Sequence, residues 1–412
     1  MNAAPQSILI VGAGQAGGCA AAALRREGYA GRITLAGAEL HRPYERPSLS
    51  KAVLHDAGAE DALFLHKPAF HDGLQLEWLP GAEVASLDIE ARVARTADGG
   101  ELAFERCLIA TGGRARLLPG LLPDAPNVHY LRALDDARAL RERLLPGASV
   151  IVIGGGFLGL EFAGMARARG MEVSVCEAGE QLLGRAAPPQ FGGWLQQCYE
   201  AAGVRIFNRA AVCAVEANGG GVAVALADGR TLRADFLLVS IGQQPNTGLA
   251  EQAGLLMDNG IAVDSRCETS APGFFAAGDC ASHVSRFLRR RVRLESWQNA
   301  QEQAQVAARA MLDLPAVYDL VPWFWSDQLG MNIQMLGMPD PGLSYLSRGQ
   351  PSDRKFSIYG FEGMQLRYAL AVNSGADIAL LRKLMSAGAM VDAALLGDPG
   401  RPVRDTVKAA LA

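Results

Sequence analysis

The chain has 412 residues and a formal net charge of −4, with half of its residues hydrophobic and a fifth charged. This length exceeds what one hydrophobic core ordinarily organises, so we expect two or three domains. The charge balance argues against a nucleic-acid-binding protein, and no stretch is apolar over the ~18 residues that a membrane helix needs. The N-terminus lacks a signal-peptide pattern, which makes a cytoplasmic location the expectation.

The first predicted unit is a strand, a glycine-rich turn and a helix. In order, it comprises an apolar strand over 8–11, the motif G-x-G-x-x-G at Gly12, Gly14 and Gly17, a helix over 15–26, and a strand over 33–36 that ends near Glu39. The first glycine permits the turn, the second lets the backbone approach a pyrophosphate, and the third lets helix and strand pack closely. The carboxylate can accept hydrogen bonds from ribose hydroxyls.

The same arrangement recurs in the middle of the chain. It comprises a strand over 150–153, the glycines Gly154, Gly156 and Gly159, a helix over 158–168, and a strand over 172–176 that leads to Glu177. Because every part of the pattern agrees twice, we expect two dinucleotide sites. A carboxylate at Glu177 suits the free 2′-hydroxyl of NAD and repels the phosphate of NADP, so NADH is the expected nicotinamide cofactor.

The remaining segments predict further strands, an acid and a charged hairpin. Residues 222–242 suggest two strands around a turn at 228–229, and an apolar run over 273–277 leads to Gly278 and Asp279. On its own, Asp279 is also explained as an ordinary helix N-cap. Residues 285–296 carry five arginines, and the last ~90 residues begin with a Trp-Phe-Trp cluster at 323–325 and contain a helix around 376–386.

Several longer motifs connect these elements. They are RPYERPSLSK (42–51), LIATGGRARLLPG (108–120), IGQQPN (241–246), FFAAGDCA (274–281), RVRLESWQNAQEQA (291–304) and PWFWSDQ (322–328). In this order, and over essentially the whole chain, the sequence resembles the FAD-containing ferredoxin reductases that serve bacterial aromatic-ring dioxygenases and haem-thiolate monooxygenases. The last two motifs are far more specific than either glycine turn.

The resemblance implies an α/β fold with two Rossmann-like dinucleotide-binding domains, as in glutathione reductase, and a smaller C-terminal α+β domain. The expected boundaries are 1–112 with 243–322 for a discontinuous FAD-binding domain, 113–242 for the NAD-binding domain, and 323–412 for the C-terminal domain.

It also implies FAD in the first site and NADH in the second. The residues that match the family's FAD contacts are Gly12, Gly14, Ala16, Gly17, Glu39, Arg46, Lys51, Val84, Ala110, Thr111, Gly112, Arg132, Asp279 and Trp297. The expected NAD-binding residues are Gly154, Gly156, Leu158, Gly159, Glu161, Glu177 and Gly242. One departure is Ala38, which stands where relatives often have aspartate, so Glu39 would have to carry the ribose contact.

Lys51 and Glu161 form the expected catalytic pair. In the family this glutamate approaches the nicotinamide and the flavin-side lysine, and Lys51 could donate a hydrogen bond near flavin N5, the atom that receives hydride. From spacing alone, a solvated surface lysine is the favoured interpretation of Lys51, and only the resemblance reverses it; for Glu161 the alternative is an acid favoured by the helix dipole at an N-terminus.

The function implied is electron transfer from NADH through FAD to a [2Fe–2S] ferredoxin that feeds an oxygenase. Arg289, Arg290, Arg291 and Arg293 would steer an acidic ferredoxin, and the alternative interpretation of this segment is an arginine-rich solvated hairpin. The seven cysteines show no C-x-x-C or C-x₄-C spacing, and the histidines no H-E-x-x-H, so neither a disulfide reductase nor a metal site is expected.

Three alternatives stay open on the same fold. They are an NADH oxidase, a rubredoxin- or quinone-type reductase, and an NADH-sensing flavoprotein similar to apoptosis-inducing factor. A monomer or weak homodimer is the expected oligomeric state.

Overall fold

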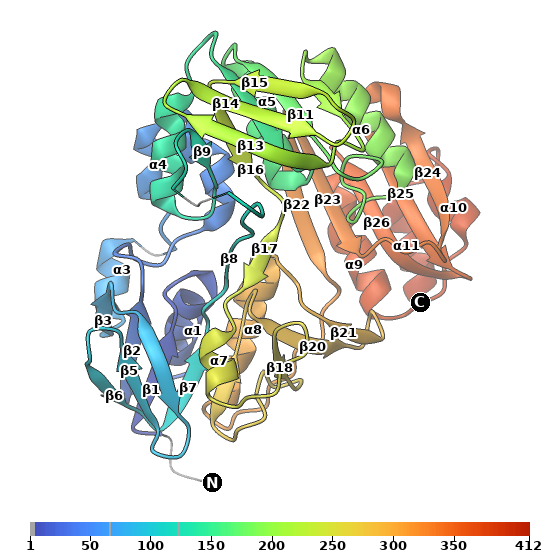
Figure 1. Ribbon diagram of the computed structural model, residues 1–412. Helices are drawn as coiled ribbons and strands as arrows, with labels where there is room; N and C mark the ends of the chain where they lie inside the picture. The colour runs from blue at the N-terminus through green and yellow to red at the C-terminus, as the bar shows by residue number, and fades with distance from the viewer. Residues whose placement is uncertain (1–4, 66, 122–123) are drawn as a thin grey trace. The chain divides into compact units, whose positions relative to one another are not determined.

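The computed structural model describes residues 5–65, 67–121 and 124–412 (Figure 1). They fall into two compact units. The first comprises Met1–Pro47, Gly58–Arg114 and Gln244–Leu320, and the second comprises Ser48–Ala57, Ala115–Gln243 and Val321–Ala412. Two of the boundaries between the units fall within β8 (Gly113–Ala115) and β17 (Gln243–Pro245).

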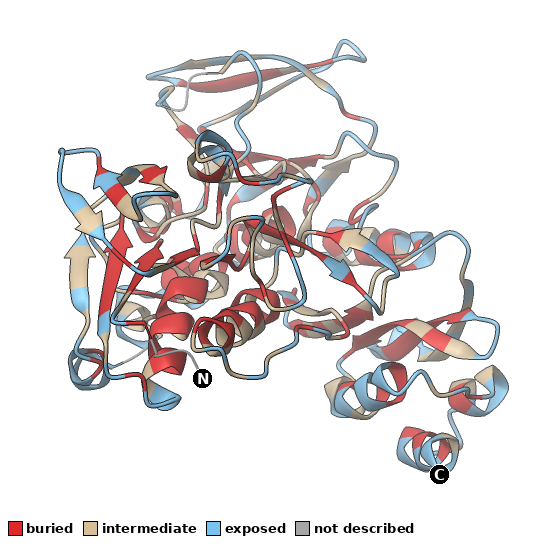
Figure 2. Cartoon of the chain, turned by 90° about the horizontal axis from the view of Figure 1, so that it is seen from below, coloured by how far each residue is buried: buried red, intermediate tan, exposed pale blue. Residues whose placement is uncertain are grey.

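The first unit is built on a five-stranded parallel sheet in the order β19-β7-β1-β2-β3. These strands are β1 (Ser7–Val11), β2 (Arg32–Gly37), β3 (Glu77–Pro80), β7 (Arg106–Ile109) and β19 (Phe274–Ala276). Ile8 and Ile10 pack in one hydrophobic cluster with α1 (Gln15–Arg26) and α8 (Trp297–Ala310), whereas Leu9 and Val11 pack in a second cluster. Both faces of the sheet are therefore buried along β1, as the all-apolar strand indicates; buried residues are red in Figure 2, whereas the edge strand β3 is intermediate or exposed.

Smaller elements complete this unit. They are the helices α3 (Pro68–Gly73) and α7 (Gly248–Gln252), the antiparallel sheet β4 (Val84–Asp88), β5 (Val93–Thr96) and β6 (Glu101–Ala103), and the sheet of β18 (Ile261–Val263), β20 (Ala281–Ser285) and β21 (Arg290–Val292).

The second unit also contains a five-stranded parallel sheet, in the order β12-β11-β10-β16-β9; its edge strand β9 precedes β10 in the chain, whereas β19, at the same place in the first sheet, is the last strand of that sheet in sequence. Its strands are β9 (Val128–His129), β10 (Ser149–Ile153), β11 (Glu172–Cys176), β12 (Arg205–Phe207) and β16 (Phe236–Val239). The helices are α2 (Ala52–His55), α4 (Leu134–Arg143), α5 (Phe157–Ala168) and α6 (Pro189–Ala201). The expected pair of strands around residues 228–229 is β14 (Gly221–Leu226) and β15 (Thr231–Ala234), joined by β13 (Val212–Asn218).

The C-terminal part of the second unit is an antiparallel sheet in the order β22-β23-β26-β25-β24. The strands are β22 (Trp323–Gln328), β23 (Met331–Gly337), β24 (Ser344–Gln350), β25 (Lys355–Glu362) and β26 (Gln365–Val372). The helices are α9 (Ile378–Ser386), α10 (Ala393–Gly397) and α11 (Val403–Leu411). The edge strand β22 packs on α5.

Two parallel sheets that share the arrangement of four of their five strands, together with an antiparallel sheet covered by helices, confirm the expected fold class. The three domain boundaries remain a prediction, because the compact units place the NAD-binding and C-terminal segments together. No helix in the described part of the chain is long and apolar enough to cross a membrane. Among the described residues, no group of three histidines, cysteines or acids is arranged to hold a metal ion.

Candidate active site

The two glycine-rich turns have the same backbone geometry. Gly12 has φ +110° and Gly154 has φ +108°, values that side-chain-bearing residues rarely adopt. A Cβ added at Gly12 would lie 2.3 Å from the carbonyl oxygen of Ala110, and one at Gly154 would lie 2.2 Å from that of Ser240. Each turn therefore requires glycine, because the backbone at the end of the neighbouring strand, β7 in the first sheet and β16 in the second, comes too close for a side chain.

The helix that follows each turn begins at an open space. Around a Cβ added at Gly14 or at Gly156, no atom of the described residues lies within 4 Å. Neither α1 nor α5 has an acidic residue in its first turn or a side-chain cap among the described residues. The free N–H groups and the space beside them suit a pyrophosphate. The residues present thus fit a dinucleotide at both turns, as FAD and NADH require.

Most of the predicted FAD-binding residues lie along one edge of the first sheet. Parallel strands end at the same edge, so the strand order places four segments side by side. These are Asp279 after β19, Ala110–Gly112 after β7, the glycine turn with Ala16 after β1, and Glu39 after β2. A Cβ added at Gly278 would lie 3.2 Å from Ala16 Cβ, so the acid-bearing turn and the glycine-rich turn are in close proximity.

Glu39 and Arg46 form an ion pair in this unit. Arg46 Nη2 and the Tyr44 hydroxyl each donate to the Glu39 carboxylate at 2.6 Å. Burial by itself would raise the pKa of Glu39, but the Arg46 charge and these hydrogen bonds outweigh it and lower that pKa. Both side chains are therefore charged at neutral pH, which is the form that contacts with ribose and pyrophosphate would use.

Other predicted FAD-binding residues are distributed between the units. Val84 begins β4, and Trp297 begins α8, where its indole Nε1 donates to Glu45 Oε1 at 3.2 Å in the first unit. Lys51 and Arg132 belong instead to the second unit. Arg132 precedes α4, and its backbone N–H donates to Asp136 Oδ2 at 2.8 Å.

In the second turn, Glu177 has a structural role that its sequence position did not show. Its two carboxylate oxygens accept from the backbone N–H groups of Gly155 and Gly179, each at 2.7 Å. The acid therefore holds the glycine-rich turn as well as the loop after β11. Leu158 lies in the first turn of α5, and Gly242 follows β16 with φ +100°.

The acids of the two sites do not occupy equivalent positions. The backbone N–H of Gly12 donates to the carbonyl oxygen of the residue before Gly37. The N–H of Gly154 donates in the same way to the residue before Glu177, and both distances are 2.8 Å. Gly37 is thus the counterpart of Glu177, and Glu39 lies two residues further along the chain. The repeat is exact in the turn but not in the carboxylate that follows it.

The structure brings the predicted catalytic pair together within the second unit. Lys51 Nζ lies 3.6 Å from Glu161 Oε1. The Glu161 side chain is 9% exposed, and its carboxylate accepts from the hydroxyls of Ser50 at 2.5 Å and Ser326 at 2.6 Å. Lys51 is closer still to Asp327, with 2.8 Å between Nζ and Oδ2.

Sequence reasoning missed Ser50, Ser326 and Asp327. Ser326 and Asp327 belong to the motif PWFWSDQ, which stood out as specific without a role for its polar residues. The signal available in the sequence was strand alternation, which places Trp323, Trp325 and Asp327 on one face of the strand and the residues between them on the other. The two indoles stack with their centroids 5.0 Å apart, and Lys51 Nζ lies 5.6 Å from the Trp325 ring centroid.

The arginines of the predicted docking patch have different surroundings. Arg293 is 11% exposed, pairs with Glu295 at 2.6 Å and donates to the carbonyl of Asp279 at 3.1 Å. Arg291 donates to Ser282 O at 2.7 Å and pairs with Asp258 at 3.3 Å. Arg289 and Arg290 are exposed at the tip of the hairpin. Ferredoxin docking stays a prediction, and Arg289 and Arg290 are its most accessible members.

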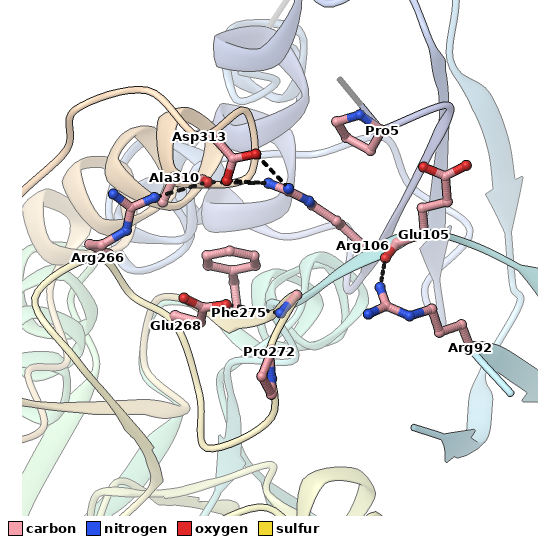
Figure 3. Close-up of a pocket in the computed structure, with 11 residues that line it drawn as sticks. Pro5, Arg92, Glu105, Arg106, Arg266, Glu268, Pro272, Phe275, Ala310 and Asp313 are labelled. Carbon is pink, nitrogen blue, oxygen red and sulfur yellow. Dashed lines mark hydrogen bonds and ion pairs between the residues drawn. The ribbon is translucent and has the colours of Figure 1, made fainter. Parts of the chain in front are cut away.

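A cavity of about 450 Å³ lies at the other end of the first sheet, where β7 and β19 begin (Figure 3). Its polar side chains are already engaged in the fold. Arg106 and Arg266 donate to Ala310 O near the end of α8, and Arg106 also pairs with Asp313 at 2.7 Å. Glu268 accepts from Gly273 N–H at 2.9 Å. We therefore place the active site at the glycine-rich turns rather than in this cavity.

Comparison with known proteins gives a consistent result. Residues 6–304 match the family described as pyridine nucleotide-disulphide oxidoreductase, and residues 323–407 match a reductase C-terminal family. The chain is 40% identical over 400 residues to the ferredoxin–NAD(+) reductase component of the anthranilate 1,2-dioxygenase system of Burkholderia cepacia, covering 97% of this chain and 98% of that protein. It is 34% identical to putidaredoxin reductase of Pseudomonas putida, covering 100% of this chain and 99% of the relative.

The fold agrees with a solved structure as well. The reductase in the crystal structure of the covalent putidaredoxin reductase–putidaredoxin complex matches with a TM-score of 0.95 and 34% identity, covering 99% of this chain and 100% of that one. The ferredoxin reductase of the CYP199A2 system from Rhodopseudomonas palustris matches with a TM-score of 0.93 and 36% identity, over 98% and 100% of the two chains.

Proposed function

Because the chain belongs to the pyridine nucleotide-disulphide oxidoreductase family, and to its ferredoxin–NAD(+) reductases, we propose that it transfers electrons from NADH through FAD to a [2Fe–2S] ferredoxin. The observation that carries this proposal is the pair of glycine-rich turns with matching geometry, one in each compact unit. One dinucleotide turn would serve a simple dehydrogenase. Two turns suit an enzyme that holds a bound flavin and a nicotinamide substrate together.

In this proposal the first unit holds FAD, which when bound accepts two electrons as hydride and releases them one at a time. The open helix start at Gly14 takes the pyrophosphate, and the carboxylate of Glu39 takes ribose hydroxyls. Arg46 neutralises phosphate charge, and Asp279 binds the ribityl chain from the end of β19. Each of these roles extends the resemblance to the residues that the sheet order places along one edge.

The second unit holds NADH. Gly156 leaves space for the pyrophosphate, and Glu177 accepts from the adenosine ribose. Its carboxylate is also fixed by two backbone N–H groups, so it is already oriented before the nucleotide arrives. Glu161 and Lys51 would line the place of hydride transfer, with the lysine presenting a charged donor and the glutamate held still by two hydroxyls.

The partner is proposed from the relatives. Putidaredoxin reductase was solved as a covalent complex with putidaredoxin, and the Burkholderia relative is a component of a dioxygenase system. We assign this chain an acidic ferredoxin of the same kind, which in turn feeds an oxygenase. The exposed Arg289 and Arg290 would steer its approach. A cytoplasmic location and a monomer or weak homodimer complete the proposal.

The experiment that tests this function measures NADH oxidation with and without a [2Fe–2S] ferredoxin, using cytochrome c as the final acceptor. We expect the rate to rise with ferredoxin and to saturate, while oxygen consumption stays slow. Protein stripped of flavin is the control and should be inactive until FAD is restored. Rapid oxygen consumption that does not respond to ferredoxin would contradict the proposal and indicate an NADH oxidase.

A further inference from the structure

The nearest carboxylate to Lys51 is not the predicted partner Glu161. Lys51 Nζ donates to Asp327 Oδ2 at 2.8 Å, whereas Glu161 Oε1 lies 3.6 Å away. Ser50 and Ser326 already donate to the Glu161 carboxylate at 2.5 and 2.6 Å, so both of its oxygens have closer donors than the lysine. The direct hydrogen bond that fixes the ammonium group is therefore the one that Lys51 donates to Asp327.

The strand that carries Asp327 is fixed by buried hydrogen bonds. Ser326 and Gln328 are fully buried, and Gln328 Nε2 donates to Ser326 Oγ at 2.7 Å and to Phe157 O at 3.2 Å. The buried hydroxyl of Tyr199 hydrogen bonds Gln328 Oε1. This face of β22 is thereby attached to α5 and α6, and the opposite face presents Asp327 to the lysine.

The backbone around Lys51 is also held within the second unit. Arg141 Nη1 donates to Val53 O at 3.0 Å, and Arg169 Nη2 donates to Leu54 O at 3.0 Å and to His55 O at 2.6 Å. Both ends of the Lys51–Asp327 hydrogen bond thus start from fixed backbone. A contact between two anchored groups loses less conformational entropy than one between flexible surface side chains.

Asp327 is itself held in its charged form. Burial would raise its pKa, but the hydrogen bonds from Lys51 and Asn332 together with the lysine charge lower it. Asn332 Nδ2 donates to Asp327 Oδ1 at 3.0 Å, which leaves Oδ2 directed to the lysine. Oδ1 therefore has its own donor in Asn332 and does not compete with Oδ2 for the hydrogen bond from Lys51.

We propose that Asp327 is a positioning residue for the Lys51 ammonium group. The ammonium group lies between two carboxylates, those of Asp327 and Glu161. The inference rests on the proposed function, in which Lys51 serves the hydride-transfer site. It gives the C-terminal sheet a part in the NADH half of the reaction. The edge strand β22 would set where the lysine points, while Glu161 provides a second charge at longer range.

The test uses the holoenzyme and three variants. Asp327→Asn removes the charge with little change of shape, and Asp327→Glu restores it one methylene further out. Asp353→Asn removes the same charge from an exposed position of the C-terminal part and is the matched control. Thermal unfolding of each variant shows whether the fold is kept.

Two readouts separate positioning from general damage. The first is the rate at which an amine-acylating reagent modifies Lys51, followed by peptide mass spectrometry, with Lys67, Lys383 and Lys408 as internal references among the five lysines of the chain. The second is the limiting rate of flavin reduction by saturating NADH under anaerobic conditions. The dissociation constant for NADH is obtained from the same traces.

We expect Asp327→Asn to raise Lys51 acylation about threefold or more and to slow limiting flavin reduction about tenfold, with the NADH dissociation constant within about twofold of the parent. Asp327→Glu should recover part of both effects, and Asp353→Asn should show neither. The inference is overturned if Asp327→Asn behaves like Asp353→Asn, or if only one of the two readouts changes. If the unaltered protein is not reduced by NADH, the proposed function fails, while the acylation result still tests the contact.

Discussion

Replacing Gly156 with alanine should weaken NADH binding without harming the fold, whereas the same change two residues earlier should harm the fold itself. Gly156 has φ −84° and ψ −179°, an extended conformation that alanine adopts freely, and no described atom lies within 4 Å of the added Cβ. Gly154 has φ +108°, and its added Cβ would lie 2.2 Å from Ser240 O. The two variants make the same chemical change, glycine to alanine, and differ only in their position within one turn.

The expected magnitudes follow from these geometries. Gly156→Ala should stabilise the protein by about 0.4–1 kcal/mol through the unfolded state. In Gly154→Ala, the strained φ and the overlap with a backbone oxygen each cost about 1–3 kcal/mol, which for a chain of 412 residues lowers Tm by about 2–7 °C. In Gly156→Ala, the added methyl group would lie against the pyrophosphate and should weaken NADH binding by about 10- to 200-fold.

Circular dichroism melting and kcat/KM for NADH with ferricyanide as acceptor check both variants. Gly14→Ala provides the parallel test at the first turn, where loss of bound FAD rather than of NADH is expected, because its added Cβ also meets open space. If Gly156→Ala kept its kcat/KM for NADH within about twofold of the parent value, the assignment of the second turn to the NADH pyrophosphate would be refuted.

Three further outcomes are expected. Glu177→Arg should lower kcat/KM for NADH about tenfold and shift the NADPH-to-NADH ratio, and an unchanged ratio would count against this acid as the ribose ligand. Burial, assisted by the Arg291 charge, lowers the pKa of His283 from 6.5 to about 4. The folded state therefore resists protonation, so the free energy of unfolding should be highest above pH 6.5 and fall by about 3 kcal/mol toward pH 4. Urea titration should show this loss reduced by about that amount in His283→Gln, while the lowered carboxylate pKa values of Glu39 and Asp327 leave a remaining loss at low pH; an unchanged loss would contradict the assignment. Arg289→Glu combined with Arg290→Glu should slow ferredoxin association about fivefold at low ionic strength, and a decrease that survives about 0.5 M salt would argue against electrostatic steering.

The nucleotide-binding turns could be predicted from sequence because their requirements are local. A positive φ and a neighbouring carbonyl require glycine at positions 12 and 154, and both features follow from how a strand, a turn and a helix connect. Boundaries agreed closely: the expected helix over 158–168 is observed at Phe157–Ala168. The offset between Glu39 and Glu177 escaped notice because it depends on strand register, which a single strand does not reveal.

The residues around Lys51 show where local reasoning ends. Glu161 lies 110 positions from Lys51 along the chain, and it was paired with the lysine only through resemblance to a family. Asp327 is 276 positions away and lies on a strand whose alternation could be seen but whose neighbour could not. Long-range pairs of this kind are set by tertiary packing, and neither spacing nor propensity encodes them.

The arginine-rich hairpin illustrates a further limit. Counting charges treats its arginines alike, but Arg291 and Arg293 spend their donors on backbone carbonyls and nearby acids. Composition can predict that a positive segment exists. Which guanidinium groups reach solvent depends on the carbonyls that the fold leaves beside them.

The claim on which everything else depends is that flavin and nicotinamide act in sequence in this one chain. Anaerobic stopped-flow mixing of the purified protein with NADH, followed by oxidised [2Fe–2S] ferredoxin, tests it directly. We predict a yellow protein whose visible flavin absorbance bleaches with NADH and returns as ferredoxin is reduced, two ferredoxins for each NADH. A protein that cannot be loaded with flavin, or whose colour persists in NADH, would contradict the account.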